Sequence, residues 1–344
     1  MSDPKTMTHH PFPSIDQFSH VRRNVLWKAQ YRGQDANNEP IMDRTATMPT
    51  LSYEGTCKLH GTNFGICFEK NNGFYCQSRE RIITPESDNA GSATWANSVS
   101  EQDWNLFRAN FPADWNKVAV YGEWAGTGIQ KNVAIATLPK AFYIFAARLI
   151  SEDGEREEWL DTRNWVLPQG IYNIYNYPTF KIDINFESPE YAIAEINKWV
   201  LEVEEQCPVG KAFGASGIGE GIVFRCVTEG WESSRYWYKA KGAKHSATHV
   251  RKLATIDIEK YETEQAFISA VLDEGRLEQG YNWLKENNKP QDQSSTGEFI
   301  RWIFNDVIKE CSLEMEASNI EEKNLGKLLA APAKKWYFAR LNQN

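Results

Sequence analysis

A lysine with the surroundings of a nucleophile lies in the segment Lys58–Asn63 (KLHGTN). A lysine attacks phosphorus only through its neutral amine, a form that desolvation and neighbouring cations favour. Gly61 would let the backbone approach a nucleotide closely, and Asn63 could orient one of its polar groups. Taken alone, this short pattern is more typical of an exposed lysine in a turn than of an active site.

Four later segments carry charged or aromatic residues that suit a nucleoside triphosphate. One strand-like run ends at Glu123, one contains the aromatic stretch Phe142–Phe145, and one begins at Glu220. Lys239 and Lys241 are two positions apart, which places both side chains on one face of a strand. Two adjacent ammonium groups repel each other, so an anionic partner such as a triphosphate explains the pair. The order of these segments indicates nucleotide chemistry more strongly than any one of them does.

The elements that would position these residues are mainly strands up to about residue 245. The clearest is a hairpin, in which Phe64, Ile66 and Phe68 alternate with smaller or polar residues before the turn at 71–73 (NNG). An amphipathic helix is predicted over Ser188–Glu205. Further strands are predicted at Val118–Tyr121, Phe142–Ile150, Gly221–Val227 and Arg235–Ala240.

The spacing of apolar residues becomes helical after about residue 250. We therefore expect an N-terminal tail over 1–13, a large domain over 14–250 and a small helical domain over 251–344. The fold class is α+β, with antiparallel sheets and flanking helices followed by an all-helical C-terminal domain. The C-terminal helices are predicted at Gln265–Asp273, Leu277–Glu286, Glu298–Met315 and Leu325–Leu341.

The bulk composition fits a globular protein, with 41% hydrophobic and 24% charged residues. No apolar run approaches the roughly 20 residues that span a bilayer, and the N-terminal region lacks the apolar core of a signal peptide. We therefore expect a cytoplasmic protein without a membrane partner, located in the host cell if a phage encodes it. The six cysteines form no CxxC pair, which predicts neither a disulfide framework nor a zinc site.

The net charge of −8 argues against a protein that coats nucleic acid without specificity, although a local basic cluster could still bind phosphates. Such a cluster is more often a solvated face when it is considered alone. The glycine-rich run at 214–219 lacks the Gly-Lys-Ser/Thr of a phosphate-binding loop, so we expect a mobile loop there. The basic cluster comprises Lys239, Lys241, Lys244, Arg251 and Lys252, with His245 and His249 among them.

The order and spacing of the five segments resemble nucleotidyltransferase motifs I, III, IIIa, IV and V of ATP-dependent ligases and capping enzymes. Within that superfamily the chain is similar to the RNA ligase 2 group, which includes phage double-strand RNA ligases and kinetoplastid editing ligases. The most specific stretches are Lys58–Phe64 (KLHGTNF) and Tyr121–Val133 (YGEWAGTGIQKNV). The resemblance covers about residues 14–250 and implies the nucleotidyltransferase fold, which is ATP-grasp-like.

The resemblance implies a role for each matching residue. Lys58 would form the lysyl–AMP phosphoramidate, and Lys239 and Lys241 would grip the α-phosphate and stabilise charge there. Glu220 would act in catalysis by holding a divalent metal, Mg²⁺ or Mn²⁺. The remaining residues would bind the nucleotide: Cys57 beside the nucleophile, His60 at the departing pyrophosphate, Asn63 and Arg79 at the sugar or the RNA end, Glu123 at the ribose hydroxyl, Phe145 stacked on adenine, and Arg225 at the phosphates or the RNA end.

Two positions depart from the pattern of the group. Relatives often carry lysine where this chain has Arg225, and the planar guanidinium would contact phosphate in a different geometry. Relatives often carry an acidic residue after the motif IIIa aromatic, whereas Ala146 follows Phe145 here. This chain therefore lacks that carboxylate and any metal or substrate contact that it would make.

These roles predict an ATP-dependent RNA ligase that joins 3′-hydroxyl and 5′-phosphate ends, at nicks in duplex RNA, through lysyl–AMP and an adenylylated 5′ end. Two alternatives stay open. One is a DNA ligase or a capping guanylyltransferase, which typically appends an OB-type barrel in place of the helices predicted after residue 250. The other is a non-catalytic module that binds RNA ends on the same fold, although such a module needs no reactive lysine.

Overall fold

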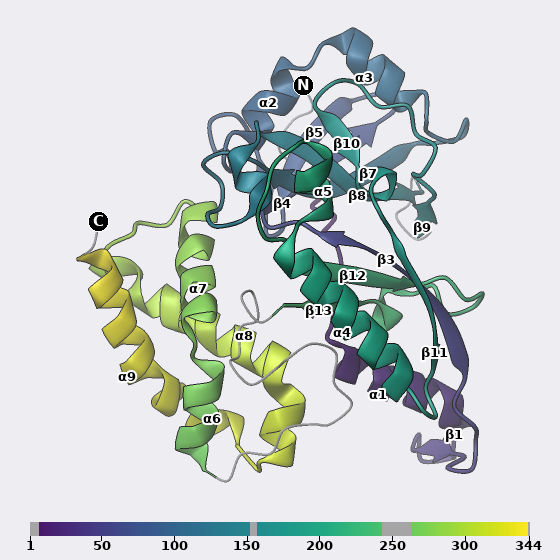
Figure 1. The fold of residues 1–344 in the computed structure, drawn as a ribbon, viewed down its shortest axis with the longest axis vertical. Helices are drawn as coiled ribbons and strands as arrows, with labels where there is room; N and C mark the ends of the chain where they lie inside the picture. Colours follow the sequence, from purple (N-terminus) through teal and green to yellow (C-terminus); the bar gives the residue numbers. More distant parts are fainter. Residues whose placement is uncertain (1–6, 152–156, 243–262, 343–344) are drawn as a thin grey trace. The chain divides into compact units, whose positions relative to one another are not determined.

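The computed structural model describes residues 7–151, 157–242 and 263–342 (Figure 1). The described chain falls into two compact units, and each unit combines segments that are distant in the sequence. The first unit contains the residues up to Pro13, Thr56–Thr179 and Val203–Glu220. The second contains Ser14–Gly55, Phe180–Glu202 and the described residues from Gly221 onward.

The first unit is built on a seven-stranded sheet with the order β10-β8-β7-β4-β5-β6, and β9 also pairs with β8. All pairs are antiparallel except β10 with β8. The predicted hairpin is confirmed as β4 and β5. The bounds are β4 Thr62–Glu69, β5 Gly73–Ser78, β6 Ile82–Ile83, β7 Lys117–Ala125, β8 Ala141–Ile150, β9 Glu157–Leu160 and β10 Ile171–Asn173.

One face of this sheet carries the core of the first unit. Phe64, Ile66 and Phe68 alternate along β4 and are fully buried on this face. Two helices, α2 (Ser92–Ser98) and α3 (Glu101–Arg108), cover the face (Figure 1). Trp104 of α3 belongs to this core. The sequence predicted the alternation in β4, but it did not predict these two short helices.

The opposite face of the sheet is covered in part by the N-terminal segment 7–13. His10 exchanges hydrogen bonds with the Gln77 side chain on β5, and Tyr75 donates its hydroxyl proton to the Thr8 carbonyl at 2.7 Å. The Phe12 ring packs against Tyr121 with 5.2 Å between ring centroids. The described part of the expected tail is therefore attached to the sheet by main-chain and aromatic contacts.

Short elements close the first unit. The glycine-rich run is held by main-chain hydrogen bonds from Cys207 to Gly217, from Gly219 to Val203 and from Ala134 to Ile218. It is thus an anchored loop, and no phosphate-binding loop of the Gly-Lys-Ser/Thr type is present there. The remaining elements are the 3₁₀ turns η1 Ala134–Thr137 and η2 Ile174–Asn176 and the short helix α5 Pro208–Ala212.

The second unit contains a four-stranded sheet with the order β11-β3-β12-β13. Its core is aromatic, because Tyr238 contacts the rings of Phe18, Tyr53 and Phe224 at 4.9–5.3 Å between centroids. The predicted amphipathic helix is confirmed as α4. The bounds are α1 Phe18–Gln30, β1 Tyr31–Gln34, β2 Pro40–Met42, β3 Thr50–Lys58, β11 Phe180–Asn185, α4 Glu190–Glu205, β12 Gly221–Cys226, η3 Ser234–Tyr236 and β13 Tyr238–Lys241.

The C-terminal residues form helices around a core of their own. The buried members of this core, such as Phe299, Ile303 and Tyr337, come from residues 267–337 (Figure 1, green to yellow). Buried Arg276 pairs with Asp306 at 2.8 Å, which links α7 to α8. All four predicted helices are confirmed: α6 Glu264–Val271, α7 Glu274–Glu286, α8 Thr296–Ala317 and α9 Glu322–Leu341, with the 3₁₀ turn η4 Gln293–Ser295 before α8.

The expected fold class, α+β with antiparallel sheets and C-terminal helices, is confirmed. The expected boundary near residue 250 lies outside the described residues, as do Lys244, His245, His249, Arg251 and Lys252 of the basic cluster. In the described ranges, none of the helices combines the length and the apolar character that a membrane span requires.

The contacts of Phe12 predict that the N-terminal segment contributes to stability. We expect Phe12→Ala to lower the free energy of unfolding by about 1–3 kcal/mol, because the ring is half-buried against Tyr121, Phe145 and Trp159. Urea denaturation followed by circular dichroism would measure the change. Val166→Ala, at a site that is 60% exposed in the same unit, is the control. Equal stability of Phe12→Ala and wild type would show that the segment is a loose tail.

Candidate active site

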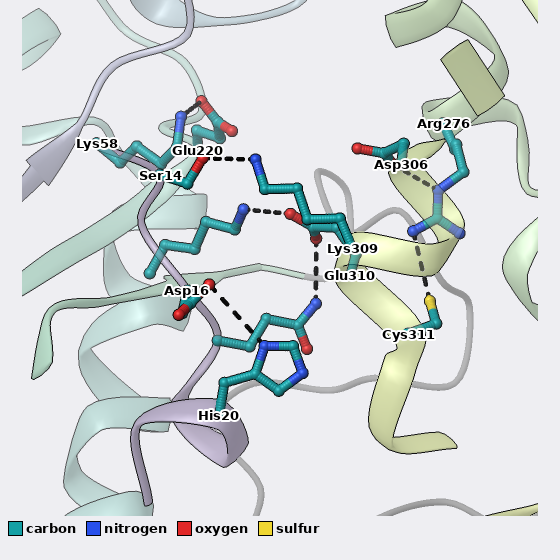
Figure 2. A network of polar contacts seen from close by, with 12 residues as sticks. Ser14, Asp16, His20, Lys58, Glu220, Arg276, Asp306, Lys309, Glu310 and Cys311 are labelled. Atoms are coloured by element: carbon teal, nitrogen blue, oxygen red, sulfur yellow. Dashed lines mark hydrogen bonds and ion pairs between the residues drawn. The ribbon is translucent and has the colours of Figure 1, made fainter. Parts of the chain in front are cut away.

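Lys58 ends strand β3 and pairs with the carboxylate of Glu220. The Lys58 Nζ atom lies 2.7 Å from Glu220 Oε2 (Figure 2). The lysine side chain is 24% exposed and the glutamate side chain only 3% exposed, so the pair shields a nearly buried anion. His60 Nδ1 lies 3.4 Å from the same oxygen. The first unit therefore brings together three residues that the motifs had suggested, from positions more than 150 residues apart in the sequence.

A glycine follows Glu220 because the backbone enters strand β12 through a conformation closed to other residues. Gly221 has φ +152°, and a Cβ atom there would lie 2.1 Å from the Ala240 carbonyl oxygen. Any side chain would separate β12 from β13 at this point. Gly221 thus fixes the residue at which β12 begins. This in turn fixes the position of the Glu220 carboxylate directly before the strand.

Glu123 lies on β7, directly opposite Asn63 on β4 and Tyr143 on β8. Its Oε1 atom accepts a hydrogen bond from the Gly61 main-chain N–H at 2.9 Å. A Cβ atom on Gly61 would lie 2.4 Å from the Trp124 carbonyl oxygen. The glycine after His60 is therefore required for close packing against β7, a reason that the sequence had not suggested.

The electrostatic surroundings of Glu123 oppose its ionisation. Burial raises the pKa of the Glu123 carboxyl, the nearby Glu220 carboxylate raises it further, and Lys58, His60 and the Gly61 N–H act in the opposite direction. The net pKa lies above the ordinary value of a glutamic acid. A hydrogen-bond donor such as a ribose hydroxyl would satisfy this carboxylate.

Gln130 lies within the stretch 121–133 that resembles the RNA ligase group, but the resemblance implies no role for it. The Gln130 Nε2 atom donates to the Gly61 carbonyl oxygen at 3.1 Å, and Asn89 Nδ2 donates to Thr62 Oγ1 at 2.8 Å. Both side chains brace the loop that follows Lys58. The only signal in the sequence was that this stretch continues well beyond strand β7. It did not indicate which side chain contacts the loop after Lys58.

Phe145 lies at an irregularity in the pairing of β7 with β8. Tyr121 pairs with Ala146 and Gly122 pairs with Ile144, so Phe145 falls between the two paired positions. Its half-buried ring meets Phe12 edge-on, with centroids 4.9 Å apart. Ala146, the residue that departs from the family pattern, is buried in the same apolar cluster.

The other nucleotide-binding candidates of the first unit differ in exposure. The Arg79 side chain is 52% exposed after β5, with its Nε atom 3.9 Å from Glu80. Arg81 instead donates to the Ser87 carbonyl at 2.9 Å and braces its own loop. Cys57 is buried; its hydrogen bond to Cys207 and the burial raise the pKa of its thiol well above the usual value. The Cys57 thiol is therefore neutral and faces the interior.

The second unit gathers the three remaining candidates on one face of its sheet. Lys239 pairs with Val223 and Lys241 with Gly221, so their side chains lie on the face that also carries Arg225. The Arg225 guanidinium lies 4.4 Å from the centre of the Trp237 ring. Lys239 forms an ion pair with Glu310 of helix α8. The predicted residues are thus divided between the two units: Arg225, Lys239 and Lys241 belong to the second, and the others to the first.

A family model described as RNA ligase matches residues 52–241, more than half of the chain. The matched range includes all the candidate residues from Cys57 to Lys241. This chain belongs to the RNA ligase family. The membership agrees with the expected enzyme class, and it leaves the finer assignment to the RNA ligase 2 group untested.

Solved structures of the RNA ligase of Naegleria gruberi are similar to this chain at low identity. A substituted form with ATP and Mn has 14% identity and a TM-score of 0.40, covering 67% of this chain and 56% of that chain. The form with PPi has 14% identity and a TM-score of 0.39, covering 71% and 62%. This chain therefore spans somewhat more than half the length of these ligases.

Glu220 could hold a divalent metal. Its carboxylate is buried and paired with Lys58, and hard oxygen ligands of this kind suit Mg²⁺ or Mn²⁺. Within the described ranges, no three His, Cys, Asp or Glu side chains gather as a complete metal site. One carboxylate supplemented by substrate phosphates and water is the usual arrangement for Mg²⁺.

The raised pKa of Glu123 predicts that the folded protein does not need the negative charge of this carboxylate for its stability. The unfolded chain releases this proton at a lower pH, so the stability contribution of the protonated form is lost as pH rises through the folded pKa. At pH 7 we therefore expect Glu123→Gln to keep or raise the melting temperature, because Gln can still accept from Gly61. Thermal unfolding at pH 5 and pH 7 would measure it, with exposed Glu80→Gln as control. A melting temperature several degrees lower at pH 7 would contradict this interpretation.

Proposed function

We propose that the chain is an ATP-dependent RNA ligase that carries AMP on Lys58. The observation that supports this most directly is the cluster of Lys58, His60, Glu123 and Glu220 within one unit of an RNA ligase family member. The cluster joins a lysine, a buried carboxylate and a second carboxylate with a raised pKa, which a simple binding surface does not need.

In the first step, Lys58 Nζ forms a bond to the α-phosphorus of ATP, and the bond to the departing pyrophosphate breaks. The lysine must lose a proton before it attacks, and Glu220 Oε2 at 2.7 Å lies within reach of that proton. His60 beside the same oxygen would contact the pyrophosphate. Glu123 would accept from the ribose, Asn63 and Arg79 would contact the sugar or the RNA end, and Phe145 would stack on the adenine.

The divalent metal, Mg²⁺ or Mn²⁺, would be held by Glu220 and would neutralise the charge that develops on the phosphates. Lys239, Lys241 and Arg225 would add positive charge at the α-phosphate or the RNA end. Cys57 would contribute to the nucleotide site through its position beside Lys58.

The later steps transfer AMP from Lys58 to an RNA 5′-phosphate and then expel AMP when an RNA 3′-hydroxyl attacks the activated end. We propose nicks in duplex RNA as the substrate, as in the RNA ligase 2 group. Two observations count against a DNA ligase or a capping guanylyltransferase: the family match, and the helices α6–α9 in place of a barrel among the described C-terminal residues. Sealing of nicked duplexes with RNA or DNA 3′ ends would separate these activities.

Incubation with α-labelled ATP and Mg²⁺ tests the proposal. Wild type is expected to retain label after denaturation, and Lys58→Ala to lose it completely, because no other amine takes the place of Nζ. Lys70→Ala, an exposed lysine of the same unit that contacts only main chain in the described structure, is the control and should label like wild type.

Label from ATP and not from GTP would agree with the proposal. Protein that is already adenylylated would not label, so each sample is first treated with pyrophosphate and then repurified. If wild type still takes no label after that treatment, the ligase mechanism fails and a module that binds RNA ends becomes the better account.

A further inference from the structure

Helix α8 brings a carboxylate onto one of the paired lysines of strand β13. Glu310 Oε1 lies 2.5 Å from Lys239 Nζ, and each of the two side chains is 18% exposed. The second oxygen, Oε2, accepts from Gln17 Nε2 at 3.1 Å. Both oxygens of Glu310 are therefore engaged by residues that lie outside the C-terminal helices.

Glu310 is an anion at neutral pH. Burial opposes its ionisation, but Lys239, Lys241 and Arg276 hold the pKa of this carboxyl well below its usual range. The carboxylate thus presents a negative charge to the two lysines to which the motifs assign a phosphate. A carboxylate and a phosphate satisfy an ammonium group through the same kind of charge-assisted hydrogen bond.

Several polar contacts surround this ion pair. Lys309 of α8 donates a hydrogen bond to Ser14 at 2.5 Å (Figure 2). Further along the same helix, Ser312 Oγ lies 3.4 Å from His20 Nε2, and Glu316 lies 3.3 Å from Arg23. The Arg23 and Glu316 side chains are 64% and 72% exposed. Exposed pairs of this kind contribute about 0–1 kcal/mol each.

Among the described residues, the apolar core of the C-terminal helices draws its members from the C-terminal segment alone. Its buried members lie between residues 267 and 337, and the apolar residues packed against them lie between 272 and 341. The ion pair of Glu310 with Lys239 therefore joins helix α8 to strand β13 through two side chains that are each 18% exposed.

We propose that Glu310 is an autoinhibitory latch, which occupies the phosphate position on Lys239 and must leave before the nucleotide phosphates bind there. This inference rests on the proposed function of Lys239. A polyphosphate and the Glu310 carboxylate cannot share one ammonium group without placing like charges together. Molecules in the latched state do not bind ATP productively, so the latch multiplies the apparent KM for ATP by the reciprocal of the fraction of open molecules.

The initial rate of lysyl–AMP formation against ATP concentration tests the latch. Glu310→Gln removes the charge but keeps the size of the side chain, and we expect the KM for ATP to fall about fivefold or more with kcat retained. Glu316→Gln breaks another contact of the same helix away from Lys239, and it should leave both constants unchanged. Gln17→Leu removes the hydrogen bond to Glu310 Oε2 and should also lower the KM for ATP, by a smaller factor.

The outcomes separate this inference from the function on which it rests. Label on wild type with an unchanged or higher KM in Glu310→Gln overturns the latch, because a carboxylate that only positions Lys239 would help the reaction. Complete absence of label on wild type after pyrophosphate treatment refutes the proposed function itself. Circular dichroism checks that each variant is folded, and Gln17→Leu provides the decision if Glu310→Gln does not fold.

Discussion

The ion pair between Lys58 and Glu220 determines much of what surrounds it. A carboxylate that is 3% exposed needs a cation, and removal of one partner from such a buried pair typically destabilises a protein by about 3–5 kcal/mol. The end of β3 at Lys58 and the start of β12 after Glu220 must therefore keep the two side chains within contact distance of each other. Gly61 and Gly221 allow this because a Cβ atom at either position would overlap main-chain oxygen.

The second unit repeats the same physical arrangement with different residues. Lys239 is paired with Glu310 as Lys58 is paired with Glu220, so each of the two lysines most important to the proposed chemistry rests against a carboxylate. In this account the protein's contribution to the reaction is mostly positioning and electrostatics.

Much of the fold could be predicted because its signals are local. The hairpin β4–β5, helix α4 and the four C-terminal helices each have a hydrophobic period that the sequence displays directly. Helices α2 and α3 are short and lie within a region of strands, so their spacing is too brief to stand out. The attachment of residues 7–13 depends on Tyr75, Gln77 and Tyr121, which are distant in the sequence. Such pairings leave no local pattern.

The sequence predicted which residues belong to the candidate site, but it did not predict which of them form ion pairs and hydrogen bonds with each other. The motifs indicated Lys58, Glu123 and Glu220 as functional, yet nothing in their spacing showed that the first and last form an ion pair. Gln130 and Glu310 act through contacts across 69 and 71 positions respectively, and each lies in a segment of ordinary polar composition. Recognition of such residues requires the folded chain, because only the tertiary structure brings their partners within hydrogen-bond distance.

Peptide mapping of the nucleotide attachment tests the central claim most directly. The protein would be incubated with ATP and Mg²⁺, digested at neutral pH to preserve a phosphoramidate, and sequenced by tandem mass spectrometry. The account predicts AMP on Lys58 alone, with the modification absent after incubation with excess pyrophosphate. AMP on any other residue, Lys239 and Lys241 included, would contradict the assignment of Lys58 as the nucleophile.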